Sequence, residues 1–197
     1  MNKFKKFWKK LGEYNKIAKI SEIARRYFVM NSFDGILTIL GILIGTYIAK
    51  VQDYRIIIST GLAVSIAMAV SGISGTYLTE EAERTKKLKD LGRQTLTNMK
   101  YTSIGKAERA ATLIVSFIDG LAPFLSAMII LTPFFLINLI NLQFAYYISI
   151  SISFLLLIIL GGFLGHISRE GVFKNAMKMV LAGLVSVTLI FILGVHG

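Results

Sequence analysis

Two aspartates, Asp34 and Asp119, lie inside long apolar stretches of this sequence in closely similar surroundings. The first lies in Ser-Phe-Asp-Gly-Ile-Leu (32–37) and the second in Ser-Phe-Ile-Asp-Gly-Leu (116–121), which has one residue inserted. A carboxylate in such a segment is costly unless it is paired, protonated or facing water, so an ionisable residue at membrane depth is a candidate functional residue. Two such residues in a repeated motif predict a path for a cation.

We expect the two carboxylates and one methionine to lie at similar depth. At about 1.5 Å per helical residue, Asp34 and Asp119 lie about 12 and 15 Å beyond the nearest preceding arginine, and Met68 lies about 18 Å before Glu80. In a hydrocarbon core about 30 Å thick, the three side chains would converge near the middle.

Pro123 predicts a further oxygen ligand beside Asp119. A proline within a helix removes the hydrogen bond to the carbonyl four residues earlier, here that of Asp119. A carboxylate and a free carbonyl suit a divalent cation, and a thioether from Met68 would favour iron or another transition metal over magnesium or calcium. For Met68, ordinary packing is the competing interpretation.

The composition indicates an all-α, polytopic membrane protein. Hydrophobic residues make up 54% of the 197-residue chain, which is too apolar for a soluble domain of this size. Each predicted span is near the ~20 residues needed to cross a bilayer. The five predicted spans are residues 29–50, 56–79, 110–137, 144–167 and 179–196.

Basic residues predict the orientation. Of the 22 Lys and Arg, 20 lie in the N-terminal tail or in the connections after the second and fourth spans, and only Lys50 and Arg55 remain for the other side. The positive-inside rule then places the N-terminus in the cytoplasm and the C-terminus outside. The net charge of +11 indicates contact with a membrane surface rather than with nucleic acid. The chain has no cysteine, which excludes a thiolate metal site.

Residues 1–28 form a basic segment with a helical pattern of large apolar side chains. Such a helix would lie on an anionic leaflet, whereas a purely topogenic basic tail is the alternative. The apolar residues of the pattern are Phe4, Phe7, Trp8, Leu11 and Tyr14.

An internal repeat organises the rest of the chain. The aspartate motif opens the first and third spans, and the glycine-rich ends of the second and fourth, 71–75 and 161–165, match at an offset of 90 residues. The sequence therefore predicts two parallel helical hairpins plus a fifth helix, with a site at the interface of the repeats. In chain order, we expect the N-terminal segment, spans one and two (29–79), a charged cytoplasmic segment (80–109), and spans three to five (110–197).

The charged segment contains three further candidate metal ligands, Glu80, Glu81 and Glu83. Glu80 and Glu83 can share a helix face, but Arg84 and three lysines surround them and offset their charge. A solvated helix with surface salt bridges is the favoured interpretation of this segment.

Several stretches resemble the vacuolar iron transporter family. They are Asn-Ser-Phe-Asp-Gly-Ile-Leu-Thr-Ile-Leu-Gly (31–41), Ala-Met-Ala-Val (67–70), Gly-Leu-Ala-Pro (120–123) and Thr-Pro-Phe (132–134). The resemblance implies a five-helix homodimer that exports Fe²⁺ or Mn²⁺ in exchange for protons, with Asp34 and Met68 in the pore. The metal would be cargo, and no resident cofactor is implied. The chain departs from the family in lacking a Gly-Glu-Tyr element after the Met-Ala pair, and its cytoplasmic segment is short.

Two other classes of function could place an aspartate within a membrane span. A membrane enzyme resembling CDP-alcohol phosphotransferases would need an Ala-Arg after the Asp-Gly and two further aspartates, which this chain lacks. A non-transporting scaffold or regulatory membrane protein would tolerate neutralisation of both aspartates.

His166 and His196 lie near span ends and are assigned no role. A cell membrane is the simplest expected location.

Overall fold

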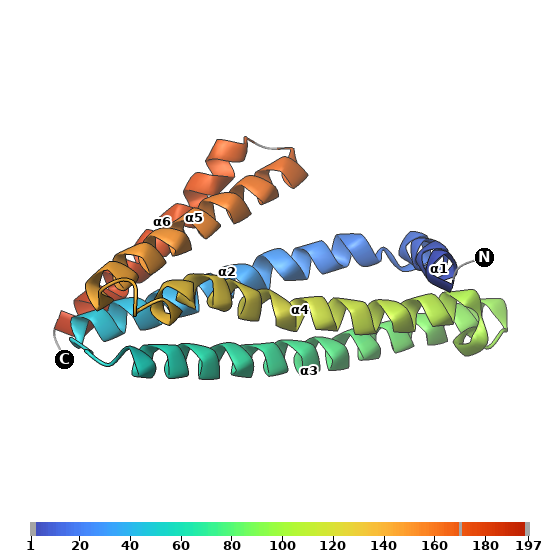
Figure 1. The fold of residues 1–197 in the computed structure, drawn as a ribbon. Helices are drawn as coiled ribbons and strands as arrows, with labels where there is room; N and C mark the ends of the chain where they lie inside the picture. The colour runs from blue at the N-terminus through green and yellow to red at the C-terminus, as the bar shows by residue number, and fades with distance from the viewer. Residues whose placement is uncertain (1–2, 170, 196–197) are drawn as a thin grey trace. The chain divides into compact units, whose positions relative to one another are not determined.

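The computed structural model describes residues 3–169 and 171–195, and its regular secondary structure there is helical throughout (Figure 1). Five of the helices are long and apolar enough to cross a membrane, which confirms the predicted all-α fold with five spans. The predicted end of the fifth span at residue 196, with His196, lies outside the described residues. The elements are α1 (Lys3–Ala18), α2 (Ile20–Ile48), α3 (Tyr54–Thr95), the short 3₁₀ helix η1 (Met99–Tyr101), α4 (Ser103–Phe135), α5 (Leu142–Ser168) and α6 (Val172–Val195).

The helices extend beyond the apolar segments that hydropathy identifies. Helix α3 has 42 residues and is therefore about 63 Å long, roughly twice the thickness of a hydrocarbon core. It continues without a break past residue 79, and α4 begins at Ser103. The predicted charged segment is therefore mainly the end of α3 and the start of α4, joined by a short connection that holds η1.

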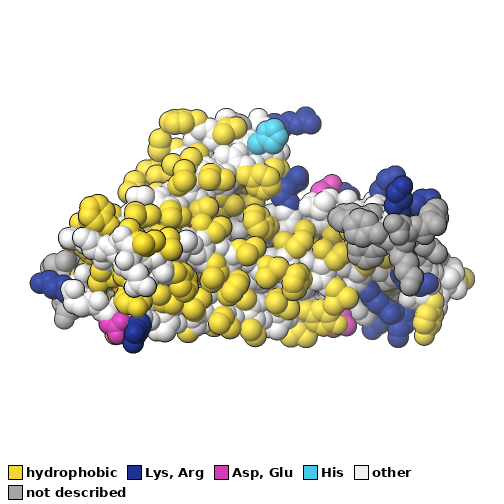
Figure 2. Space-filling view, viewed as in Figure 1, with side chains coloured by type: hydrophobic (Ala, Val, Ile, Leu, Met, Phe, Trp, Pro, Cys, Tyr) yellow, Lys and Arg dark blue, Asp and Glu magenta, His cyan; other side chains and the backbone are white. Residues whose placement is uncertain are grey.

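The chain divides into two compact units. The first unit contains residues 1–28 and 70–121, and the second contains residues 29–69 and 122–197. The N-terminal segment thus groups with the charged parts of α3 and α4, although about forty residues of chain separate it from them. Figure 2 shows hydrophobic side chains over the long helices and Lys and Arg side chains gathered toward their ends.

Small residues form the core of the first unit. Ala18, Ile20 and Ala24 are buried with Ala107 and Ala111 of α4, and Tyr14 packs against this cluster. Lys19 has a positive φ of 50° and separates α1 from α2. One face of the N-terminal segment therefore packs on protein, while its contact with a leaflet stays a prediction. The side chains of Phe4, Phe7 and Trp8 lie outside the described part of the chain.

The second unit has a larger core of branched and aromatic side chains. Ile39 and Leu43 of α2 are buried with Leu131 and Phe134 of α4 and with Tyr146 of α5. The Phe134 and Tyr146 rings meet edge to face with centroids 5.2 Å apart. Helices α5 and α6 pack against each other as neighbours along the chain.

Glycine allows the close approach of α5 and α6. A Cβ atom built on Gly161 would lie 2.6 Å from the Cα atom of Ala176, and one on Gly165 would lie 2.8 Å from the Cα atom of Val172. Small residues permit such backbone contact between membrane helices, where van der Waals packing is a main source of association.

We predict that Gly161→Ala destabilises the protein whereas Gly162→Ala does not. The first substitution forces α5 and α6 apart at Ala176, at a cost of about 1–3 kcal/mol. A Cβ atom on Gly162 would make an ordinary 3.4 Å contact with Val172, so alanine there should be neutral or slightly stabilising. Thermal unfolding of both variants in detergent measures the difference, and equal midpoints would contradict the observed packing.

Candidate functional site

Asp119 is buried within the first unit and is held by α3. Its exposed fraction is 3%, and the Thr76 hydroxyl donates to its Oδ2 atom at 2.5 Å. A Cβ atom on Gly72 would lie 3.0 Å from the Cα atom of Gly120 and 3.3 Å from Asp119 Oδ2. Glycines on both helices therefore bring α3 and α4 together, and this close approach allows the hydroxyl of Thr76 to reach the carboxyl group.

Asp34 has a different environment in the second unit. Its side chain is exposed, whereas the next two residues, Gly35 and Ile36, are buried. A Cβ atom on Gly35 would lie 2.6 Å from the Cα atom of Pro123, so α2 and α4 are in backbone contact there. That contact sets the rotation of α2 and places the carboxyl group of Asp34 on an open face of a membrane span.

The predicted ligands are divided between the two units of the structure. Within the described residues, no group of three or more His, Cys, Asp and Glu side chains is placed to hold a metal ion. Met68 is half-buried in the second unit, to which Asp34 also belongs. Asp119 belongs to the first unit, so its convergence with Asp34 and Met68 stays a prediction.

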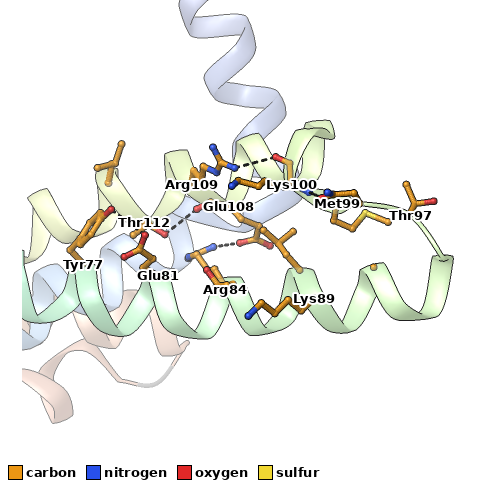
Figure 3. A pocket seen from close by; sticks show the side chains of 15 residues that line it. Tyr77, Glu81, Arg84, Lys89, Thr97, Met99, Lys100, Glu108, Arg109 and Thr112 are labelled. Atoms are coloured by element: carbon orange, nitrogen blue, oxygen red, sulfur yellow. Dashed lines mark hydrogen bonds and ion pairs between the residues drawn. The ribbon is translucent and has the colours of Figure 1, made fainter.

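A buried cluster of charged side chains ties three helices of the first unit together. Arg84 Nη2 lies 2.7 Å from Glu80 Oε2 and Arg84 Nη1 pairs with Glu108. Lys87 Nζ lies 2.6 Å from Glu108 Oε1, and the Tyr27 hydroxyl donates to Glu80 Oε1 at 3.2 Å. Figure 3 shows Arg84 of α3 directed at Glu108 of α4. Two carboxylates are thus balanced by two cations across α3 and α4, and the Tyr27 hydroxyl links the cluster to α2.

This cluster corrects one expectation for the charged segment. The segment is helical and carries salt bridges as predicted, but Glu80, Arg84 and Glu108 are buried rather than solvated. Glu81 and Glu83 are exposed, and Glu81 accepts a hydrogen bond from the Tyr77 hydroxyl at 3.4 Å. Glu80 is therefore committed to an internal ion pair, whereas Glu81 and Glu83 face outward.

Sequence reasoning missed Thr76, Glu108 and Tyr27 as partners. The spacing of four residues between Glu80 and Arg84 is typical of an ion pair on one helix face. Nothing local identifies Glu108 or Tyr27, because each reaches its partner across 21 or more residues of chain. The local sequence does not identify Thr76 either, because its partner, Asp119, is 43 residues away.

These features define an integral, multi-pass membrane protein with one buried and one outward-facing carboxyl group in its spans. The sequence profile of the VIT family matches residues 25–113, a range that contains Asp34, Met68 and the charged cluster but ends before Asp119. The chain is also 34% identical over 176 residues to the uncharacterized protein MJ0645 of Methanocaldococcus jannaschii, covering 87% of this chain and 89% of that protein. The chain belongs to the VIT family, a family of transporters rather than enzymes. This membership indicates membrane metal-ion transport.

We predict that Arg84→Met lowers the stability of the first unit much more than Arg93→Met does. Removing Arg84 leaves Glu80 and Glu108 buried with incomplete compensation, at a cost of about 3 kcal/mol. Arg93 pairs with Asp90 only at 3.9 Å on an exposed surface, and such pairs contribute less than about 1 kcal/mol.

Backbone hydrogen exchange over residues 80–112 reports the stability of this unit directly. Protection should fall strongly in Arg84→Met and remain near wild type in Arg93→Met. The same protection in both variants would show that the buried cluster contributes little to stability.

Proposed function

We propose that this protein exports a divalent transition-metal ion, Fe²⁺ or Mn²⁺, from the cytoplasm in exchange for protons. Family membership supports the transport of a metal ion, and the position of Asp34 supports the route. The single observation that carries the proposal is the carboxyl group of Asp34 on an exposed face of a membrane span. The ion is cargo, and the proposal requires no resident cofactor.

The cost of a charge facing lipid argues that Asp34 faces a polar path. A carboxylate in a membrane span faces a bundle interior or a water-filled cavity in most known cases. Gly35 fixes the rotation of α2 by its contact with Pro123, so the carboxyl group cannot reach the core of its own unit without breaking that packing. This exposure supports the proposal that a second surface covers Asp34 and encloses a polar path.

We propose that a second copy of the chain supplies this surface. The face of α2 that carries Asp34 also carries Thr38 and Gly45 at helical spacing, and both are partly exposed. Gly41 lies between them and packs against Ile190 of α6. Small residues at such spacing let two helices approach closely. In a homodimer, the Asp34 carboxyl groups of both protomers would face each other and form the central part of the path.

Ligand chemistry supports a transition metal as the cargo. The Met68 thioether is a softer ligand than a carboxylate oxygen, and it favours a transition metal such as Fe²⁺ over Mg²⁺ and Ca²⁺. Pro123, which lies inside α4, removes the helical partner of the Asp119 carbonyl. The proposed ligand set is therefore Asp34 and Met68, with Asp119 as a further carboxyl group that takes up and releases protons. Glu83, exposed at the charged end of α3, is proposed to attract the ion from the cytoplasm. Glu81 is also exposed, but it lines a pocket together with three exposed basic side chains.

The proposed direction of transport, from the cytoplasm outward, relies on the proposed orientation of the chain. The 20-to-2 distribution of basic residues supports a cytoplasmic N-terminus and an outer C-terminus, and the cell membrane is the proposed location. The charged first unit would then lie on the cytoplasmic side, where it can meet the ion before the ion enters the spans.

We predict that Asp34→Asn abolishes metal transport while Asp53→Asn leaves it unchanged. The amide cannot supply the negative charge that holds a divalent ion, although its size and its packing beside Gly35 are preserved. Asp53 accepts a hydrogen bond from the backbone N–H of Arg55 at the start of α3, and asparagine can make the same bond. Uptake of Fe²⁺, Mn²⁺, Zn²⁺ and Ca²⁺ into proteoliposomes, measured in parallel, tests both substitutions.

Wild-type uptake by the Asp34→Asn variant would exclude the proposed path. If the wild-type protein moves none of the four ions, a non-transporting scaffold or regulatory function becomes the better explanation. Size-exclusion chromatography of each variant shows whether folding and assembly are intact.

We predict that metal entry into proteoliposomes is accompanied by a rise in internal pH. A carboxyl group must release its proton to bind the ion, so each ion that enters is exchanged for protons that leave. A pH-sensitive dye trapped inside reports the change, and acidifying the side that receives the ion should accelerate transport. Asp119→Asn should weaken the dye response more gently than Asp34→Asn, because the Asp119 carbonyl remains available as a ligand. Metal flux with no dye response at any imposed gradient would identify a uniporter.

A further inference from the structure

The first unit contains a pocket of about 690 Å³ between the charged end of α3, the connection that holds η1, and the start of α4 (Figure 3). All its lining residues belong to the first unit. Arg84 and Glu108 form part of its wall, and their charges are already balanced within the buried cluster. The remaining charged side chains of the lining therefore decide what the pocket can bind.

Those remaining side chains are mainly basic. Lys89, Lys100 and Arg109 line the pocket and are exposed, and within the described residues none of the three forms an ion pair with a carboxylate. Arg109 Nη2 donates to the backbone oxygen of Lys100 at 3.4 Å, which holds the loop and α4 together on one side of the pocket. Glu81 is the one acidic lining residue outside the buried cluster. The pocket thus has an excess of two positive charges.

One end of the pocket is apolar and adjoins the membrane spans. Tyr77 and Leu113 line it there, and the Leu113 side chain is 61% exposed. Tyr77 lies in the last turn of the predicted second span, and Leu113 lies in the first turn of the third. The pocket therefore extends from the charged helix ends to the level where the apolar spans begin.

We propose that this pocket binds the phosphate headgroup of an anionic phospholipid. The phosphate oxygens would accept hydrogen bonds from Lys89, Lys100 and Arg109, and the acyl chains would lie along Leu113 toward the bilayer. Basic pockets beside membrane helices are recognised binding sites for anionic headgroups. The excess of positive charge excludes a free cation as the preferred ligand, and the adjoining apolar end favours a lipid over a soluble phosphate. The inference does not depend on which ion the protein transports.

The test uses the full-length protein in a neutral detergent and two double variants of equal charge. Lys89→Gln with Arg109→Gln removes two basic groups from the pocket. Lys86→Gln with Lys106→Gln removes two exposed basic groups from the same two helices but outside this pocket. The probes are short-chain dioctanoyl phosphatidylglycerol, dioctanoyl phosphatidylcholine and inorganic phosphate, and native mass spectrometry measures binding.

Phosphatidylglycerol should bind to the wild-type protein and to the Lys86/Lys106 variant with similar affinity. It should bind roughly 30-fold more weakly to the Lys89/Arg109 variant, from the energy of two basic contacts at a membrane surface. Equal weakening in both variants would overturn the proposal, because it would indicate non-specific attraction to net charge. Equal binding of phosphatidylcholine would exclude recognition of an anion, and inorganic phosphate binding as tightly as phosphatidylglycerol would identify a soluble ligand instead. Thermal unfolding of both variants verifies that they are folded.

Discussion

The cost of holding a carboxylate away from bulk water shapes this protein more than any other interaction. Asp119 and Glu108 are both almost fully buried, and each is held by donors from α3: the Thr76 hydroxyl for Asp119, and Arg84 with Lys87 for Glu108. An unpaired buried charge would cost several kcal/mol. The pairing of α3 with α4 is therefore set by polar contacts as well as by apolar packing. Among the described residues of its own unit, no donor pairs with the exposed Asp34 side chain. This supports the proposal that a second protomer or a polar path surrounds it.

Close helix contacts make these polar arrangements possible. Helices in a bilayer gain little from the hydrophobic effect when they associate, so packing and hydrogen bonds between small residues carry more of the energy. Gly72 brings the backbone of α3 against Gly120, within reach of the carboxyl group beside it, and Gly35 brings α2 against Pro123. In each case the close contact lies beside one of the two aspartates, Asp119 next to Gly120 and Asp34 next to Gly35, and the glycine contact fixes the rotation of the helix that carries the carboxyl group.

The charged end of the molecule links the spans to the cytoplasmic surface that we propose for it. An unbroken α3 carries the buried ion-pair cluster about one turn beyond the predicted membrane boundary and joins it to α2 through Tyr27 and to α4 through Glu108. The exposed Glu83 and the basic pocket lie on the same helical segments as this cluster. The groups that we propose to attract an ion and those that we propose to hold an anionic lipid thus lie on α3 and α4, whose buried charges are paired with each other.

The sequence by itself determined the class of protein and the number of spans, because hydropathy and charge are local properties that can be counted along the chain. It predicted a role for the two aspartates. It also carried the family signature around Asp34 and Met68. Only the tertiary structure decided that two nearly identical aspartate motifs have opposite environments, one buried against Thr76 and one exposed, and that Glu80 and Glu108 share Arg84. Burial and pairing depend on residues that are 24 to 53 positions apart in the chain. No local pattern specifies which face of one helix meets which face of another, so these contacts could be known only from the folded chain.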